Sequence, residues 1–166
     1  MATLREKLHP SASYEEDGYG WALEQAELLR ARRFDRIDAD NIAEEIEGLA
    51  KGIAGELRNR YGTLLTHLLK WQFQPEQRSY SWVGTIRRER IEITKHLRDN
   101  PGLQPRREEL FDDSYEGARL QAVSETNLPP ERFPEARPYL LEQAMDPAFW
   151  PGGEDLPERP RRKGRR

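Results

Sequence analysis

The chain has 166 residues, of which 36% are hydrophobic and 34% are charged, and its net charge is −3. This length suits one domain with a hydrophobic core and is too short for two comfortable ones. The sequence contains no cysteine, which excludes disulfides, thiolate nucleophiles and Cys-ligated zinc or iron–sulfur centres.

The charge is unevenly distributed along the chain. Residues 157–166 carry six basic side chains and one acidic one, which leaves residues 1–156 with a net charge of −8. A body of that sign repels nucleic acid, whereas a basic tail attracts it. The first residues lack the apolar core of a signal peptide, and no run of about 18 apolar residues occurs that could cross a membrane. We therefore expect a cytoplasmic protein.

The first predicted helix begins between Tyr14 and Asp17 and continues through Arg33, after a flexible lead-in at residues 1–13. Four of its residues fall on one side, which indicates that the helix packs by a single stripe. The stripe consists of Trp21, Gln25, Leu28 and Leu29.

The strongest pattern lies between residues 39 and 73. Apolar residues recur there at steps of three or four, which is the α-helical period and predicts one long central helix. They are Ile42, Ile46, Leu49, Ile53, Leu57, Tyr61, Leu64, Leu68 and Trp71. Asp38 is the expected N-cap, and Gln74-Pro75 ends the helix. We expect the apolar side of this helix to form the spine of the core.

Four glycines share a face of the same helix, although each costs about 1 kcal/mol relative to alanine. They are Gly48, Gly52, Gly55 and Gly62. Close approach of another helix explains them and makes this face a candidate interface. A bend at one of the glycines is the alternative.

Three further helices are predicted, over residues 79–98, 105–127 and 138–145. The first is capped by Ser79 or Ser81, and the second ends at Asn127, which tolerates the left-handed conformation. From residue 151 the chain is rich in Pro, Gly and Arg, which predicts a disordered basic tail over residues 151–166. No strand pattern occurs. We predict an all-α fold, an antiparallel bundle of about four main helices forming a single domain at residues 14–150.

Four segments of the chain match, in order, motifs of a known bacterial family. They are Asp38-Ala-Asp-Asn41-Ile-Ala-Glu44-Glu45-Ile46-Glu47, His67-Leu-Leu-Lys70-Trp71-Gln-Phe-Gln74-Pro75, Ser81-Trp82-Val-Gly-Thr85-Ile86 and Glu125-Thr126-Asn127-Leu128-Pro129. Through them the chain resembles the family called domain of unknown function 29, over roughly residues 14–149. The resemblance implies an all-helical fold and assigns no activity.

The chain departs from that family at three places. Ile53 and Gly55 stand where the family has a charged stretch, and Asn127 stands where it has a glycine. Residues 137–139 read Arg-Pro-Tyr where the family has Cys-Pro-Trp. The missing cysteine argues against any thiol chemistry shared by the whole family.

One corner of the predicted bundle gathers residues that bind anions in other proteins. These residues lie at the end of the long helix and at the start of the next one. They include a His, a Lys, an Arg, two further hydrogen-bonding side chains and two indoles. They are His67, Lys70, Trp71, Gln74, Arg78, Trp82 and Thr85. They form either an anion site or a packed hairpin whose cations complement a helix C-terminus, and packing is the more common use of such patterns.

Two acidic features have both a structural and a functional interpretation. Glu44, Glu45 and Glu47 suit the start of a helix, and the alternative is a cation site or an acid–base pair. Glu125 at a helix end calls for a basic partner, for which Arg88 and Arg90 are candidates. We expect no metal and no cofactor, because no complete ligand set or nucleotide-binding motif is present.

Three hypotheses follow for the function. The first is a non-enzymatic binding or assembly module that self-associates or docks a protein partner. The second is an enzyme or ligand-binding protein with a small anionic ligand at the His67–Trp82 corner. The third is weak nucleic-acid binding through the basic tail. Under none of the three do we expect the protein to bind a membrane.

Overall fold

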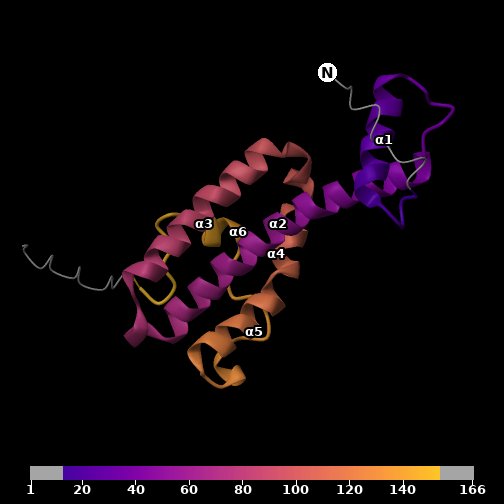
Figure 1. Ribbon diagram of the computed structural model, residues 1–166. Helices are drawn as coiled ribbons and strands as arrows, with labels where there is room; N and C mark the ends of the chain where they lie inside the picture. Colours follow the sequence, from indigo (N-terminus) through magenta and orange to yellow (C-terminus); the bar gives the residue numbers. More distant parts are fainter. Residues whose placement is uncertain (1–12, 154–166) are drawn as a thin grey trace, which may run out of the picture. The chain divides into compact units, whose positions relative to one another are not determined.

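A computed structural model of the protein describes residues 13–153. Within that range the chain forms six α-helices and no strand, which confirms the predicted all-α class (Figure 1). The helices are α1 (Gly18–Arg30), α2 (Ala39–Phe73), α3 (Tyr80–Asp99), α4 (Arg107–Asp113), α5 (Tyr115–Thr126) and α6 (Leu141–Met145). None of these helices combines the length and the hydropathy that crossing a bilayer requires.

The described part of the chain divides into two compact units, residues 13–52 and residues 53–153, and α2 contributes to both. Residues 1–12 of the predicted lead-in and residues 154–166 of the predicted tail lie outside the described range. Residues 151–153 of that tail lie inside it and are packed, since Pro151 is buried and the Gly152 carbonyl accepts a hydrogen bond from Arg78. The prediction of disorder from residue 151 onward is therefore wrong for these three residues.

In the first unit, α1 is held to the start of α2 by buried polar contacts. Asp17 caps α1 by accepting from the backbone of Gly20 at 2.9 Å. The buried Trp21 donates its indole N–H to Asp38, and the buried Gln25 accepts from the Asp38 backbone N–H at 2.8 Å. Asp38 is therefore both the predicted cap of α2 and the anchor of α1.

The sequence prediction for α1 needs two corrections. The helix ends at Arg30 instead of Arg33, because Arg32 adopts a positive φ of 55° that an α-helix cannot contain. Leu29 is exposed instead of facing inward, so the packed stripe of α1 is shorter than expected.

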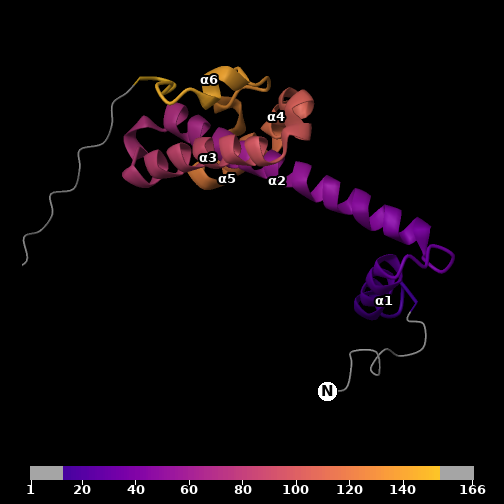
Figure 2. The same ribbon diagram turned by 90° about the horizontal axis from the view of Figure 1, so that it is seen from above.

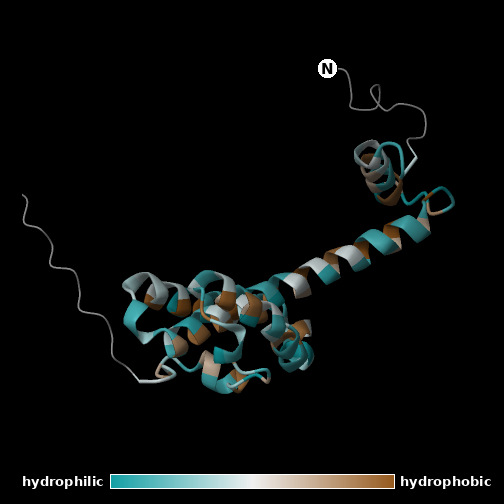
Figure 3. Cartoon of the chain, turned by 90° about the horizontal axis from the view of Figure 1, so that it is seen from below, coloured by the Kyte–Doolittle hydropathy of each residue, from teal (hydrophilic) through white to brown (hydrophobic). Residues whose placement is uncertain are grey.

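The long helix α2 is confirmed, but its apolar side is buried over only part of its length. From Leu57 to Trp71 the apolar residues are fully buried and form the core of the second unit. Ile46 and Leu49 are 63% and 66% exposed, so the prediction of a continuous buried spine is wrong there. Figure 3 shows hydrophobic residues among the hydrophilic ones along this first part of α2.

In the second unit, α3 runs antiparallel to α2 and α5 runs parallel to it. Arg60 pairs with Glu89, and His96 bonds the carbonyl of Ile53, so positions further along α3 meet earlier positions of α2. Thr66 contacts the Ala118 carbonyl and Lys70 contacts Glu125, which gives α5 the direction of α2. The antiparallel expectation holds for α2 and α3, which flank a short connection, and the views in Figures 1 and 2 agree with this arrangement. It is wrong for α2 and α5, because α4 lies between them in the chain and α5 therefore does not follow α2 through a short loop.

The predicted helix over residues 105–127 is interrupted. A 3₁₀ turn occupies Pro101–Arg106, and α4 and α5 are separated at Ser114. The buried Ser114 hydroxyl donates to the Phe111 carbonyl at 2.7 Å, a local bond that competes with the regular helix ladder. Asn127 ends α5 with a φ of 55°, as predicted.

The segment after α6 is tied back onto α3. The buried Arg90 guanidinium donates to the carbonyls of Ala144 and Phe149, both at 2.8 Å. Trp150 packs against Trp71 with ring centres 4.8 Å apart. Phe149 and Trp150 therefore pack against the core of the second unit.

Candidate functional site

The predicted corner is centred on Lys70, which is buried between two helices. Its ammonium lies 2.5 Å from Glu125 Oε2 on α5 and 4.5 Å from the centre of the Trp82 ring on α3. The expected partners of Glu125 were Arg88 and Arg90, and this prediction is wrong. Arg88 pairs with Glu89, and Arg90 points to the C-terminal segment, so the nearby Lys70 supplies the charge.

The other residues of the corner are also engaged within the chain. The Arg78 guanidinium lies 4.7 Å from the centre of the Trp71 ring and donates to the Trp71 carbonyl at 3.0 Å. The Trp71 indole donates to the carbonyl of Gly153, and the Gln74 amide donates to that of Thr126. Thr85 is half-buried on α3.

The geometry therefore brings Lys70, Trp71, Arg78 and Trp82 together, as the spacing indicated. Each cation already faces an aromatic ring, and Lys70 also faces a carboxylate. These contacts are those of the packed-hairpin interpretation. An anion at this corner stays a prediction, and it would have to compete with them.

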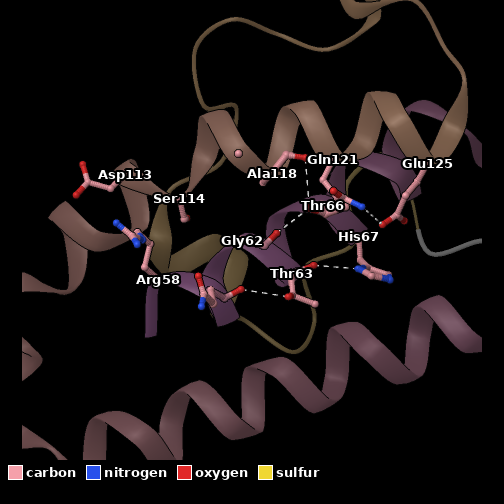
Figure 4. Close-up of a pocket in the computed structure, with 12 residues that line it drawn as sticks. Arg58, Gly62, Thr63, Thr66, His67, Asp113, Ser114, Ala118, Gln121 and Glu125 are labelled. Carbon is pink, nitrogen blue, oxygen red and sulfur yellow. Dashed lines mark hydrogen bonds between the residues drawn. The ribbon is translucent and has the colours of Figure 1, made fainter. Parts of the chain in front are cut away.

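His67 faces a different place, a groove between α2 and α5 that sequence reasoning did not identify (Figure 4). The groove has a volume of about 410 Å³. Its walls come from the second half of α2 and from residues 113–125. The residues that line it most directly are Gly62, Thr63, Thr66 and His67 on one side, and Gly117, Ala118 and Gln121 on the other.

The imidazole of His67 has a defined tautomer in this groove. Nδ1 lies 2.9 Å from the Thr63 carbonyl, which can only accept, so Nδ1 carries the proton and Nε2 presents a lone pair. Burial lowers the pKa of His67 below its usual value, and the nearby Lys70 ammonium acts in the same direction. The ring is therefore a neutral hydrogen-bond acceptor near pH 7.

The opposite end of the groove carries two charges. Arg58 and Asp113 both line it there, and neither forms an ion pair with any residue between 13 and 153. Between the two ends, a Cβ added at Gly62 or Gly117 meets no described atom within 4 Å. The two glycines thus keep the groove open.

The model of a protein family described as "Domain of unknown function DUF29" matches residues 13–150. The chain belongs to this family. The match confirms the resemblance inferred from the four sequence segments. No curated protein and no solved structure matches the chain.

Three of the four DUF29-like segments meet at the corner described above. Lys70 comes from the second segment, Trp82 from the third and Glu125 from the fourth, and the three side chains contact one another in sequence. The first segment contains Asp38, which accepts from the Trp21 indole of α1, and Asn41, whose amide donates to Asp38. Several of the residues that carry the DUF29 resemblance therefore make contacts between helices.

The acidic cluster at the start of α2 is divided among local partners. Glu45 accepts a 2.6 Å hydrogen bond from the Tyr14 hydroxyl, and Glu47 lies 3.9 Å from Lys51. In the part of this DUF29 chain that the structure describes, no three His, Asp or Glu side chains gather closely enough to hold a metal ion. Only Asp40 lies in the first turn of α2, so the helix-start interpretation of Glu44, Glu45 and Glu47 stays a prediction.

The glycine face of α2 is open in this DUF29 protein. A Cβ added at Gly48, Gly52, Gly55 or Gly62 meets no described atom within 4 Å, so no helix between residues 13 and 153 makes the predicted close approach. Gly48 and Gly55 also lie about half a turn away from Ile46 around the helix. Gly48 and Gly55 therefore face away from the exposed apolar residues, whereas Gly52 lies beside them, and a role of the glycines in contacts between molecules stays a prediction.

The sequence reasoning missed Arg58, Asp113, Gly117 and Gln121 of the groove. Arg58 and Asp113 resemble any exposed charge in a sequence this rich in them. The one indication in the sequence was Gly117, because a glycine inside a predicted helix lowers stability and calls for a reason.

Proposed function

We propose that the protein is a non-enzymatic assembly module that self-associates through the first part of α2. The observation that supports this most directly is the exposure of Ile46 and Leu49, at 63% and 66%. Large apolar side chains exposed next to one another along one helix face are typical of interaction surfaces.

The spacing of this face suits another helix. Ile42, Ile46, Leu49 and Ile53 follow one another at steps of 4, 3 and 4, which is the spacing of a coiled-coil seam. We call these four residues the α2 stripe. It covers about three turns, so it favours a short helix–helix contact over a long coiled coil.

The borders of the α2 stripe favour a second copy of the same chain. Ala43 and Ala50 border it on one side, and Glu45 and Gly52 on the other. Glu45 is already bonded to Tyr14. Two copies can therefore meet about a twofold axis without placing a row of like charges against each other.

The expected association is weak. Burying Ile46 and Leu49 of both copies contributes roughly 1 to 2 kcal/mol for each partly exposed side chain. This gain only just exceeds the lower end of the cost of association, at least about 4 kcal/mol. We therefore expect a dimer with a dissociation constant in the millimolar range or above, so the measurement has to reach high protein concentrations.

Sedimentation velocity of the full chain over a wide range of concentrations tests the proposal. The protein should shift from monomer to dimer as its concentration rises, and Ile46→Glu or Leu49→Glu should abolish the shift. The matched controls are Ile91→Glu on α3 and Leu120→Glu on α5, at side chains that are 55% and 59% exposed. A monomer at every concentration, or equal loss in the control variants, would refute self-association through the α2 stripe.

A further inference from the structure

The groove between α2 and α5 has the features of a binding site for a small molecule, and it is independent of the α2 stripe. Its two ends differ in chemistry. Arg58 and Asp113 lie at one end, and neither is paired with another residue of the described range. A ligand group that carries a positive and a negative charge close together would satisfy both.

The middle of the groove is lined by few side chains and is largely apolar. Gly62 and Gly117 contribute no side chain, and Ala118 contributes one methyl group. The Thr66 hydroxyl is occupied, since it lies within hydrogen-bond distance of the Gly62 and Ala118 carbonyls. The middle of the groove therefore suits an unbranched apolar chain, which forms no hydrogen bonds.

The other end presents an acceptor. Because His67 donates through Nδ1 to the Thr63 carbonyl, its Nε2 lone pair is directed elsewhere and can accept from a ligand. Glu125 lines the same end, bonded to Lys70 and to the Gln121 amide. A hydrogen-bond donor, cationic or neutral, is the group that this end would bind.

We propose that the groove binds an α-amino acid with an unbranched side chain that ends in a hydrogen-bond donor, as lysine does. The ligand carboxylate pairs with Arg58 and its α-ammonium with Asp113, the methylene chain lies over Gly62 and Gly117, and the terminal donor reaches His67. Arg58 and His67 are nine residues apart on α2, roughly 13 Å along the axis, and they project about half a turn apart around the helix. Both nevertheless line the same groove, so the long Arg58 side chain and an extended amino acid together have to bridge its two ends.

Isothermal titration of the full chain with four related probes tests each part of the assignment. The reference probe is L-lysine, which carries all three groups. Nα-acetyl-L-lysine lacks the α-ammonium charge, L-lysinamide lacks the carboxylate charge, and L-norleucine lacks the terminal donor. L-lysine should bind at least tenfold more tightly than each of the other three. Absence of L-lysine binding at millimolar concentration, or equal binding of any other probe, overturns the proposal.

A pair of glycine variants locates the site without touching a charged group. Gly117→Leu fills the groove and should abolish L-lysine binding, whereas Gly84→Leu on α3 should leave it unchanged. Both glycines are exposed, and an added Cβ meets no described atom within 4 Å at either, so the two changes are matched for their effect on the helix. Equal binding by wild type and Gly117→Leu would overturn the assignment.

A second pair keeps the test independent of the fold. Arg58→Ala should weaken L-lysine binding at least tenfold, while Arg87→Ala, at another exposed arginine, should not. Thermal melting of each variant checks that it remains folded. Since none of these positions lies in the α2 stripe, the sedimentation behaviour should be that of wild type, and loss of binding does not bear on self-association.

Discussion

Lys70 and Glu125 form an ion pair of 2.5 Å between α2 and α5, and the two partners differ in exposure. The Lys70 side chain is 8% exposed, whereas that of Glu125 is 35% exposed. The ammonium depends on its partner, because water has little access to it. The carboxylate can exchange Lys70 for water at a lower cost.

This asymmetry predicts unequal effects of the two single substitutions. Glu125→Gln leaves a buried ammonium without its counter-charge and should lower the free energy of unfolding by about 2 to 3 kcal/mol. Lys70→Met keeps most of the packing against Trp82 and should cost about 1 kcal/mol or less. Urea denaturation measures both. Glu92→Gln, in the more exposed pair with Lys95, is the control and should cost less than about 0.5 kcal/mol.

The pH dependence of stability should report His67. Burial lowers its pKa below the usual 6.5, so the unfolded chain binds the proton more readily than the folded protein. Stability is therefore lost as the pH falls below about 6.5 toward the lowered pKa. His67→Gln should reduce this loss in urea denaturation between pH 8 and 5.5. An unchanged slope in the variant would contradict the assignment of the neutral ring.

Glu125 should act at lower pH. Burial raises the pKa of this carboxyl, but the hydrogen bonds from Lys70 and Gln121 outweigh burial and hold the pKa below the usual 4.5. Its contribution to stability is present above pH 4.5 and is lost as the pH falls through the lowered pKa. Comparing wild type with Glu125→Gln from pH 5 to 3 should show a steeper decline in wild type.

The helices could be predicted from the sequence because their signals are local. The spacing from Ile42 to Trp71 predicted α2, the Asp38 cap and the Gln74-Pro75 stop predicted its ends, and Asn127 predicted the end of α5. The break at Ser114 was missed, because a buried serine that bonds the preceding turn looks in sequence like any helical serine.

Burial and the groove could not be predicted, because they depend on which elements meet. Ile46 and Leu57 follow the same period, yet one is exposed and the other is fully buried. Lys70 was recognised as a corner residue, but its partner Glu125 lies 55 positions away, and nothing local indicates which basic residue will reach that carboxylate.

The buried Tyr61 hydroxyl offers a test of core polarity. It makes no hydrogen bond with any residue of the described range, and burial raises its pKa to about 12. Tyr61→Phe removes a polar atom that gains nothing in the folded state and keeps the edge-to-face contact with Phe111. The variant should be as stable as wild type or up to about 1 kcal/mol more stable by thermal melting. A loss above about 1 kcal/mol would indicate a hydrogen-bonding partner for the hydroxyl.

The glycine face of α2 allows a comparison of stability with assembly. Gly48→Ala and Gly55→Ala place a methyl group where no described atom lies within 4 Å. Each should therefore raise the free energy of unfolding by about 0.5 to 1 kcal/mol, which thermal melting measures as a higher melting temperature. Gly152→Ala is the contrasting case, because its φ is 77° and an added Cβ would lie 3.2 Å from Arg78, so it should destabilise. If the alanine variants at Gly48 and Gly55 also lose the dimer, the glycine face itself is the interface.

The hydrogen bond from the Trp71 indole to the Gly153 carbonyl joins positions 82 residues apart. With the Arg90 contacts to Ala144 and Phe149, it means that 82 residues after Trp71 must be made before the core around Trp71 can close. During synthesis the Trp71 indole and the Arg90 guanidinium lack these partners until residues 144–153 have been made. Folding of the second unit should accordingly be completed only after these residues are made, and a ribosome stalled before residue 144 would carry a second unit whose core is open around Trp71 and which chaperones can bind.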